Sequence, residues 1–396
     1  MKTEGWQEGC RHEIKKFPTF GFGADKVCAV SASKFSTCTG DACMSRSILI
    51  MAGGTGGHIF PALAVADILR GQGWQVTWLG APNSMEADLV PKHGYQMAKV
   101  RFAGLRGKGL LRKLLLPFNL MVALWQSAGA MLRYRPDVVL GMGGYITFPG
   151  GLMAVLLRRP LVIHEQNSVA GLSNKVLARV ANRVLTGFPD VLPKALWCGN
   201  PVRRQITELA PPEQRYAIRT GSLNVLIVGG SLGARALNET VPQALAEMPL
   251  ETRPNVLHQT GKPHHAAVVA LYQQLGAQAD IQPFISDMAA AYANADLVVC
   301  RAGALTVAEL AAAGVASLLI PFPFAVDDHQ THNARFLSDR GAAILLPQSE
   351  LNADKLAQLL MGLGREKLLE MAQKARSVAK NHAAEAVADV CKELAE

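Results

Sequence analysis

One pattern repeats from residue 44 to the end of the chain: a short apolar run, a glycine turn, and a segment of helical composition. SILIMAGG at 47–54 is the first example, and NVLIVGG at 224–230 has the same layout in the second half of the chain. Apolar strands that alternate with helices are typical of parallel sheets with helices on both faces. We therefore predict an α/β fold. Further runs of this kind are WQVTWLG, VVLGMGG, LVIHE, DLVVCRAG and LLIPFPF.

The length and the repeat of the pattern predict two similar domains. The chain has 396 residues, and a domain has roughly 150. Turn residues are concentrated at 199–211, as GNPVRR and LAPPEQ, which we take as the hinge. We expect two Rossmann-like, doubly wound domains that face each other across a cleft. The predicted parts are an irregular leader at 1–43, a first domain at 44–203, a second domain at 204–380, and a helix at 381–396 that returns to the first domain.

Charge and cysteine usage restrict the partners and the compartment. The net charge of +9 favours an acidic partner. Only 6% of residues are aromatic and none interleave with a basic run, which argues against nucleic acid. The seven cysteines include no CxxC pair and four of them lie in the leader. We interpret them as free thiols in a reducing compartment; a redox or metal-binding tail at 1–43 is the alternative.

The glycine-rich stretch GGTGGH at 53–58 follows an apolar strand and precedes a helix, with Pro61 expected near the first helical turn. A dinucleotide-binding fingerprint would need glycine at position 59, where Ile59 stands. No GxxxxGK[ST] motif occurs either. The stretch therefore argues against nicotinamide, flavin and P-loop nucleotide sites. Close packing of backbone is the plain alternative to a ligand site here.

A second turn of this kind lies at 297–314, LVVCRAGALTVAELAAAG, where the strand ends at Gly303 and a helix begins. The unpaired N–H groups and the positive dipole end of such a helix bind anions. Glu309 lies one or two turns into the helix, where its carboxylate suits sugar hydroxyls. Diphosphate with ribose is the ligand that this arrangement favours; an ordinary β–turn–α unit is the alternative.

Polar residues gather where several of the predicted strands end. His58 is our candidate general base, because histidine titrates near neutral pH and strand ends line the crevice of open α/β sheets. Tyr145 and Glu165 are the other candidates at this edge, and Gln330 and His329 follow a strand of the second half. A structural role for a lone histidine is the alternative. The chain lacks a DxD motif, so helix N-termini and cations would have to stabilise a leaving diphosphate, without metal.

Nearly all of 44–396 consists of stretches characteristic of one family, among them MAGGTGGHIFPALAVA, MEADLVPKHG, PDVVLGMGGYITFPGGL, HEQNSVAGLSNK, GNPVR and FISDMAAAYANADLVVCRAGALTVAELAAAG. The chain resembles the UDP-N-acetylglucosamine (UDP-GlcNAc) transferases of bacterial peptidoglycan synthesis, which have the GT-B glycosyltransferase fold. The leader is foreign to that family, and the loop PFAVDDHQTH at 323–332 departs from its pattern.

The resemblance implies an inverting transfer of GlcNAc from UDP-GlcNAc to the C4 hydroxyl of MurNAc in lipid I, which gives lipid II and UDP, with no cofactor. Glu309 would hold ribose, Ser231 and the start of the 304 helix the diphosphate, and Ile285 the uracil. The implied donor-binding residues are Thr55, Gly56, Gly57, Asn167, Arg203, Ser231, Ile285, Ala304, Leu305, Thr306, Val307, Ala308, Glu309 and Gln330.

The stretch 101–126 combines Arg and Lys residues with a dense leucine-rich face. A buried helix explains the leucines, whereas an interfacial patch also explains the cations beside them. We expect this patch to dock the first domain on the anionic inner-membrane surface, which makes the protein peripheral on the cytoplasmic face of the bacterial inner membrane. Two other functions stay open: a UDP-GlcNAc 2-epimerase, and a sugar-nucleotide sensor without turnover.

Overall fold

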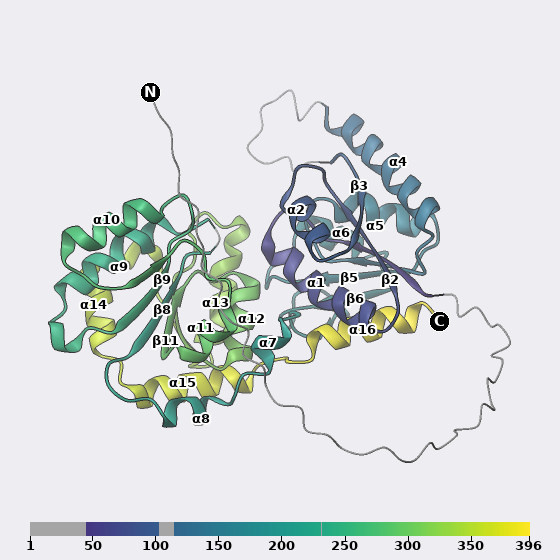
Figure 1. Ribbon diagram of the computed structural model, residues 1–396. Helices are drawn as coiled ribbons and strands as arrows, with labels where there is room; N and C mark the ends of the chain where they lie inside the picture. The colour runs from purple at the N-terminus through teal and green to yellow at the C-terminus, as the bar shows by residue number, and fades with distance from the viewer. Residues whose placement is uncertain (1–44, 103–114, 231) are drawn as a thin grey trace, which may run out of the picture. The chain divides into compact units, whose positions relative to one another are not determined.

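The computed structural model describes residues 45–102, 115–230 and 232–396, in which strands and helices alternate along the chain (Figure 1). All strand pairs in this part of the chain are parallel, and they form two sheets. The prediction of an α/β fold with two doubly wound parallel sheets is confirmed.

The first sheet has the strand order β3-β2-β1-β4-β5-β6-β7. Its strands are β1 (Ser47–Met51), β2 (Gln75–Gly80), β3 (Gln96–Lys99), β4 (Val138–Gly141), β5 (Leu161–Glu165), β6 (Arg183–Thr186) and β7 (Leu196–Trp197). The helices along this part of the chain are α1 (Gly56–Gly71), α2 (Met85–Lys92), α4 (Leu116–Tyr134), α5 (Thr147–Leu156) and α6 (Leu172–Leu177).

The second sheet has the strand order β10-β9-β8-β11-β12-β13. Its strands are β8 (Asn224–Val228), β9 (Asn255–Gln259), β10 (Asp280–Gln282), β11 (Leu297–Cys300), β12 (Ala316–Leu319) and β13 (Ala343–Leu345). Helices α7 (Arg204–Thr207) and α8 (Pro212–Ala217) precede it in sequence. The remaining helices are α9 (Arg235–Glu247), η1 (Leu250–Thr252), α10 (His265–Leu275), α11 (Met288–Asn294), α12 (Ala304–Ala313), η2 (Val326–Asp328), α13 (His329–Ser338), η3 (Gln348–Glu350), α14 (Ala353–Met361), α15 (Arg365–Ser377) and α16 (Ala383–Leu394).

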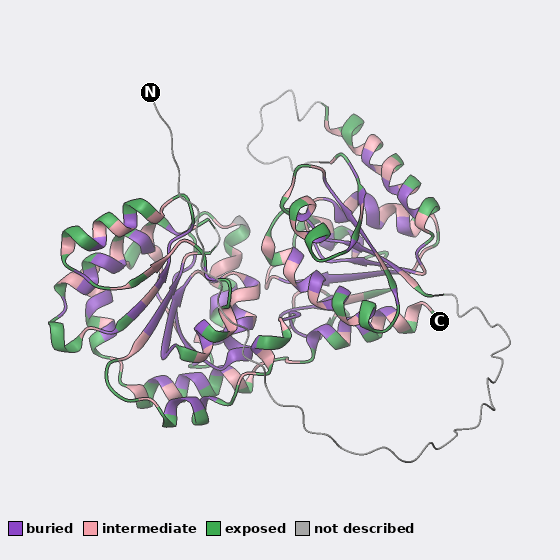
Figure 2. Ribbon diagram, in the orientation of Figure 1, coloured by how far each residue is buried: buried purple, intermediate pink, exposed green. Residues whose placement is uncertain are grey.

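Both faces of each sheet are buried, which explains why the strands read as continuous apolar runs. Successive strand residues point to opposite faces, so Ile48 and Ile50 pack with residues of α1 and α16, while Leu49 and Met51 pack with residues of α4 and α5. Figure 2 shows the strands of both sheets as buried, with exposed residues on the outward sides of the helices. The second sheet likewise has a separate apolar cluster on each face.

The strand order reverses beside the first strand of each sheet, between β1 and β4 and between β8 and β11. Open α/β sheets bind ligands outside the carboxyl ends of the strands at such points. Glycine turns follow all four of these strands, at Gly53, Gly143, Gly229 and Gly303. The glycine turns singled out in the sequence therefore lie at the two places where this architecture holds ligands.

Helix α1 begins earlier than the position of Pro61 suggested. Its first residue is Gly56, after Thr55 in an extended conformation, so Pro61 lies inside the helix and not in its first turn. His58 is consequently a residue of the first helical turn. The backbone approaches closely here: a Cβ atom on Gly144, which has a φ of +86°, would lie 2.2 Å from the carbonyl oxygen of Gly53.

Candidate active site

A cavity of about 1200 Å³ lies at the carboxyl ends of the strands. The start of α1 and the segment after β5 line it from the first sheet, and the turn after β8, the start of α12 and residues 284–285 line it from the second. Ligand pockets for single small molecules usually have about 300 to 1000 Å³. This cavity is somewhat larger than that range.

His58 lines this cavity from the first turn of α1. Its Nδ1 atom lies 2.8 Å from Oε1 of Gln166, which directly follows β5. Because Nδ1 is engaged by Gln166, Nε2 is the nitrogen that is left for a substrate. His58 thus combines a place in the cavity wall with a nitrogen, Nε2, that receives no hydrogen bond from the part of the chain that the structure describes.

Glu165 is buried at the end of β5, and its carboxylate already accepts four hydrogen bonds. Oε1 accepts from the backbone N–H of Asn167 at 3.0 Å and from its side chain at 3.3 Å, while Oε2 accepts from the N–H of Gly171 at 3.0 Å and from Asn174 at 2.9 Å. These four hydrogen bonds hold the carboxylate to the segment that follows β5. Its geometry is that of a residue that orders the 166–174 segment.

Tyr145 follows the glycine turn after β4. Burial, and then the nearby charge of Glu86, raise the pKa of its phenol, so the phenol keeps its proton at neutral pH and acts as a donor. Tyr145 does not line the cavity directly; it lies beside Gly54, where an added Cβ would be 3.6 Å from its ring. The geometry therefore disfavours Tyr145 as the base.

Glu86 is a fully buried carboxylate below the first glycine turn. Its Oε2 accepts from the N–H of Gly54 at 3.1 Å and its Oε1 accepts from the N–H of Ala81 at 3.2 Å. Glu86 also lies in the first turn of α2, where the helix dipole stabilises a negative charge. One N–H of the first glycine turn is thus occupied by a carboxylate of the protein.

Helix α12 begins at the cavity without a side-chain cap, since its N-cap residue is Gly303. Ala304, Leu305 and Thr306 line the cavity with the unpaired N–H end of the helix. The N-cap residue of α9, Ala234, also has no capping side chain and lines the same cavity. Two helix N-termini of the second sheet therefore offer N–H groups and positive dipole ends to an anion.

Glu309 is 6% exposed and forms part of the cavity wall. Its Oε1 lies 2.8 Å from Nη2 of Arg203, and its Oε2 accepts from the hydroxyl of Tyr292 at 3.1 Å. Burial raises the pKa of Glu309, although Arg203 acts in the opposite direction. Nε of Arg203 is buried and has no hydrogen-bond partner in the described part of the protein. A buried donor without an acceptor is unfavourable, and the described residues leave this N–H of the site unsatisfied.

Gln259 joins two segments of the cavity wall that the second sheet forms. At the end of β9, its Nε2 donates to the carbonyl of Gly230 at 3.1 Å, and its Oε1 accepts from the N–H of Ile285 at 2.9 Å. Gln330 lies on α13 and its Oε1 accepts from the N–H of Phe322 at 2.9 Å. Ser231 lies outside the described residues.

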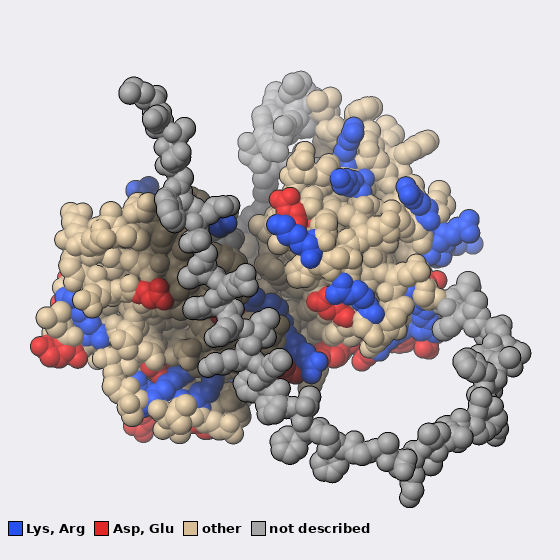
Figure 3. Space-filling model, in the orientation of Figure 1, with Lys and Arg blue, Asp and Glu red and all other residues tan. Residues whose placement is uncertain are grey.

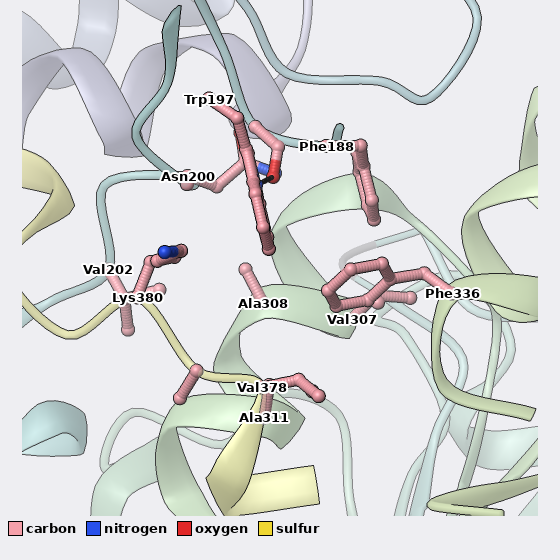
Figure 4. A pocket seen from close by; sticks show the side chains of 13 residues that line it. Phe188, Trp197, Asn200, Val202, Val307, Ala308, Ala311, Phe336, Val378 and Lys380 are labelled. Carbon is pink, nitrogen blue, oxygen red and sulfur yellow. Dashed lines mark hydrogen bonds between the residues drawn. The ribbon is translucent and has the colours of Figure 1, made fainter. Parts of the chain in front are cut away.

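The structure brings most of the residues predicted from sequence into one cavity wall. These are Thr55, Gly56, Gly57, His58, Glu165, Asn167, Arg203, Ile285, Ala304, Leu305, Thr306, Glu309 and Gln330. Val307 and Ala308 lie on another side of α12, where they line a smaller hollow with Trp197 and Phe336 (Figure 4). Their side chains are not part of the cavity wall, and donor contacts at these two positions stay predictions.

Several polar residues in or beside the site were missed by the sequence analysis, among them Glu86, Gln259 and Asn174. Gln259 carried a usable signal, because it ends an apolar strand in VLHQTGK and strand ends line the ligand crevice. Glu86 and Asn174 lie on helices, and their sequence gives no sign that they reach a glycine turn or a carboxylate.

The comparisons with known proteins agree with this geometry. The family models for the N-terminal and C-terminal domains of glycosyltransferase family 28 match residues 48–186 and 224–393. A protein of Azoarcus sp. (strain BH72) is 64% identical over 351 residues, covering 89% of this chain and 99% of that protein. It is named UDP-N-acetylglucosamine--N-acetylmuramyl-(pentapeptide) pyrophosphoryl-undecaprenol N-acetylglucosamine transferase. A protein of Dechloromonas aromatica (strain RCB) with the same name is 60% identical, covering 89% of this chain and all of its own.

Solved structures give the same result. The crystal structure of Acinetobacter baumannii MurG has a TM-score of 0.77 and 45% identity, covering 88% of this chain and 99% of that one. A kitacinnamycin glycosyltransferase has a TM-score of 0.67 at 17% identity, which shows a common fold alone. Fold and cavity thus define a glycosyltransferase of the GT-B class that uses a UDP-sugar. The chain belongs to glycosyltransferase family 28, among the relatives of MurG.

Proposed function

We propose that this protein transfers GlcNAc from UDP-GlcNAc to the C4 hydroxyl of MurNAc in lipid I, with inversion at the anomeric carbon, and so forms lipid II and UDP. The observation that carries the proposal is the cavity at the two switch points. One wall offers uncapped helix ends for a diphosphate and the other offers a histidine base. The names of the close relatives supply the identity of the two substrates.

The donor binds to the wall formed by the second sheet. The N-termini of α9 and α12 receive the diphosphate, since both present unpaired N–H groups. Glu309 accepts from ribose hydroxyls through lone pairs that Arg203 and Tyr292 leave free, and the segment at Ile285 borders the uracil. The sugar then extends towards Thr55, Gly56 and Gly57 at the start of α1.

A single displacement at the anomeric carbon explains the chemistry. Nε2 of His58 takes the proton of the acceptor hydroxyl while that oxygen forms its bond to C1 of GlcNAc. The bond between C1 and the β-phosphate oxygen breaks, and UDP leaves with the electron pair. The helix ends and Arg203 stabilise the negative charge that develops on the diphosphate.

Helix α4 supports docking on a membrane. Its buried face has small residues such as Ala123 and Ala130, whereas Phe118, Met121 and Trp125 are exposed, the last at 82%. An exposed apolar stripe of this kind marks an interaction surface. Figure 3 shows Lys and Arg side chains on the surface near α4. The cations at 106, 108, 112 and 113 lie outside the described residues. No helix in the described part of the chain is long and apolar enough to cross a membrane.

Lipid I has a polyprenyl chain that holds it in the bilayer, so an enzyme that uses it as acceptor must reach the membrane surface. We place the protein on the cytoplasmic face of the bacterial inner membrane, bound through α4 and the stretch at 101–126. Anionic lipid attracts the cations of that stretch at about 1 kcal/mol each.

The decisive assay measures UDP release from UDP-GlcNAc with and without a soluble lipid I analogue. Release only in the presence of the analogue, together with a new disaccharide product in the mass spectrum, is the expected result. Conversion of UDP-GlcNAc into its 2-epimer without the analogue, with no net release of UDP, would identify an epimerase. Binding of UDP-GlcNAc with no product in either case would identify a sensor.

A further inference from the structure

Four polar groups form a continuous row from the cavity to the segment that joins the two sheets in sequence. His58 contacts Gln166, Gln166 contacts His164, and His164 contacts the carbonyl oxygen of Gly199. We infer that Gln166 and His164 are positioning residues, which fix the proton of His58 on Nδ1 and leave Nε2 as the proton acceptor. This inference rests on the proposed role of His58.

The row has a defined direction because it ends on a carbonyl. The oxygen of Gly199 only accepts, so Nε2 of His164, at 2.8 Å, carries a proton. His164 is fully buried, and this burial lowers its pKa to about 4. The ring is therefore neutral, and its Nδ1 is an acceptor.

The amide of Gln166 is oriented by two acceptors on the same side. Its Nε2 lies 3.1 Å from Nδ1 of His164 and 3.1 Å from the carbonyl oxygen of His164. Only the NH₂ group of the amide satisfies both. Its Oε1 must then point to His58, and at 2.8 Å from Nδ1 it accepts the Nδ1–H of that ring.

The segment that carries the row is held in place on several sides. Asn200 donates to the carbonyl of Gln166 at 3.0 Å, so two neighbouring residues of the 199–200 segment hold the row. Gly143 leaves room for the contact between the rings and the amide: a Cβ atom there would lie 2.7 Å from Nδ1 of His58 and 3.1 Å from Oε1 of Gln166. The φ of Gly143 is +92°, which also favours glycine.

Lys380 lies beside Gly199 at the far end of the row. Other charged and titratable groups lie on elements near the row. They are Glu165 at the end of β5, Tyr145 after β4, Glu86 on α2 below Gly54, and Arg203, whose guanidinium lies 5.9 Å from the ring of Phe60. Glu165 and Glu86 are each bound to backbone N–H groups. The partner of Nδ1 of His58 is thus the oxygen of a neutral amide and not a carboxylate.

The test uses nitrogen-15 NMR of the full-length protein, with the His58 signals assigned by their loss in His58→Asn. In the unmutated protein at neutral pH, Nε2 of His58 should give the signal of an unprotonated nitrogen and Nδ1 that of a protonated one. Gln166→Leu removes the acceptor and should produce a mixture of tautomers. A protonated Nε2 in the unmutated protein, or an unchanged pattern in Gln166→Leu, would overturn the inference.

Kinetics separate a positioning role from a purely structural one. Gln166→Leu should lower kcat on the order of 10²-fold with donor KM nearly unchanged. Gln166→Glu keeps an acceptor for Nδ1–H of His58 but removes the NH₂ group that donates to His164, so kcat should be low at neutral pH, as in Gln166→Leu. A kcat equal to that of the unmutated protein in either variant would contradict the role of the row. Gln72→Glu, at the exposed far end of α1, is the matched control.

The inference and the proposed function fail in different ways. If the tautomer is as expected but no disaccharide forms with the lipid I analogue, the proposed function is wrong and the row still orders His58. If the disaccharide forms but the tautomer of His58 does not depend on Gln166, the inferred role of the row is wrong and the proposed function stands.

Discussion

Nη2 of Arg203 lies 2.8 Å from Oε1 of Glu309, and this ion pair joins the segment after β7 to helix α12. Arg203 is about one third exposed at the cavity, whereas Glu309 is nearly buried. The pair therefore links the charge on the cavity wall to the core of the second sheet, with Tyr292 as the third member.

Replacing Glu309 by Ala should raise the donor KM by about 10-fold or more, since a hydrogen bond to a charged group contributes about 1.5 to 3 kcal/mol. The variant should also unfold at lower temperature, because Arg203 and Tyr292 lose their partner. Initial rates at varied UDP-GlcNAc and a thermal melt measure the two effects. Glu208→Ala removes an exposed ion pair with Arg204 and is the control. An unchanged KM would reject the ribose assignment.

Replacing Gln259 by Ala should also act on the donor, by about 10-fold or more in KM, because it frees the turn at Gly230 from the segment at Ile285. Gln259→Glu should be as poor at neutral pH and partly recover at lower pH, where the protonated acid donates to Gly230 again. Titration calorimetry with UDP across pH checks this. Gln274→Ala, on the exposed side of α10, is the control. If UDP binds equally well to the unmutated protein, Gln259→Ala and Gln259→Glu, the two hydrogen bonds of Gln259 do not contribute to donor binding.

Stability should fall in acid through His258. This histidine is buried between Tyr272 and Asn238, and burial lowers its pKa from 6.5 to about 4. Between these values the unfolded chain binds a proton that the folded protein does not, so the free energy of unfolding decreases as pH falls from 6.5 towards 4. The contribution is about 3 kcal/mol.

Urea unfolding at several pH values measures this slope. His258→Gln should be less stable at neutral pH but should lose less stability between pH 6.5 and 4. The exposed His93→Gln should keep the slope of the unmutated protein. Parallel curves for His258→Gln and the unmutated protein would show that this residue does not titrate as proposed.

Changing Phe118, Met121 and Trp125 together to Ser should weaken binding to anionic vesicles by 10-fold or more, since burying one large apolar side chain contributes roughly 1.5 to 3 kcal/mol. The melting temperature should hardly change, because all three side chains are exposed. Vesicle sedimentation measures the affinity for the membrane. The variant should convert a soluble acceptor analogue at the same rate as the unmutated protein. Ile218→Ser, at another exposed apolar residue, is the control. Vesicle binding at full strength would place the membrane contact elsewhere.

The fold was accessible from the sequence because both faces of the sheets are buried. The central strands β1, β4, β8 and β11 are therefore apolar runs, and a glycine turn follows each of them. The start of α1 was placed too far along the chain, because the sequence argument relied on Pro61 and not on the extended Thr55. The first glycine turn therefore ends in a helical turn that carries His58.

The partners of the site residues could not be predicted. His58 and Gln166 are 108 positions apart in the sequence, and Arg203 and Glu309 are 106 positions apart. No local sequence pattern indicates contacts between residues so far apart. The side of α12 that meets the cavity also depends on packing, which puts Val307 in the core. Before Gln330, Asp327 and Asp328 both have positive φ. Aspartate tolerates this conformation, but an aspartate in the sequence does not by itself predict it.

The buried carboxylate of Glu86 gives the cavity an electrical direction. On the first sheet, an N–H that a dinucleotide-binding protein would offer to phosphate is already neutralised from below. On the second sheet, two helix ends remain open. The N-terminus of α1 also lacks a capping side chain, but Glu86 lies below the turn that precedes it. We therefore expect a diphosphate to be less stable at this turn than at α9 and α12, which favours one direction of entry for a UDP-sugar before any group specific to uracil or GlcNAc is recognised.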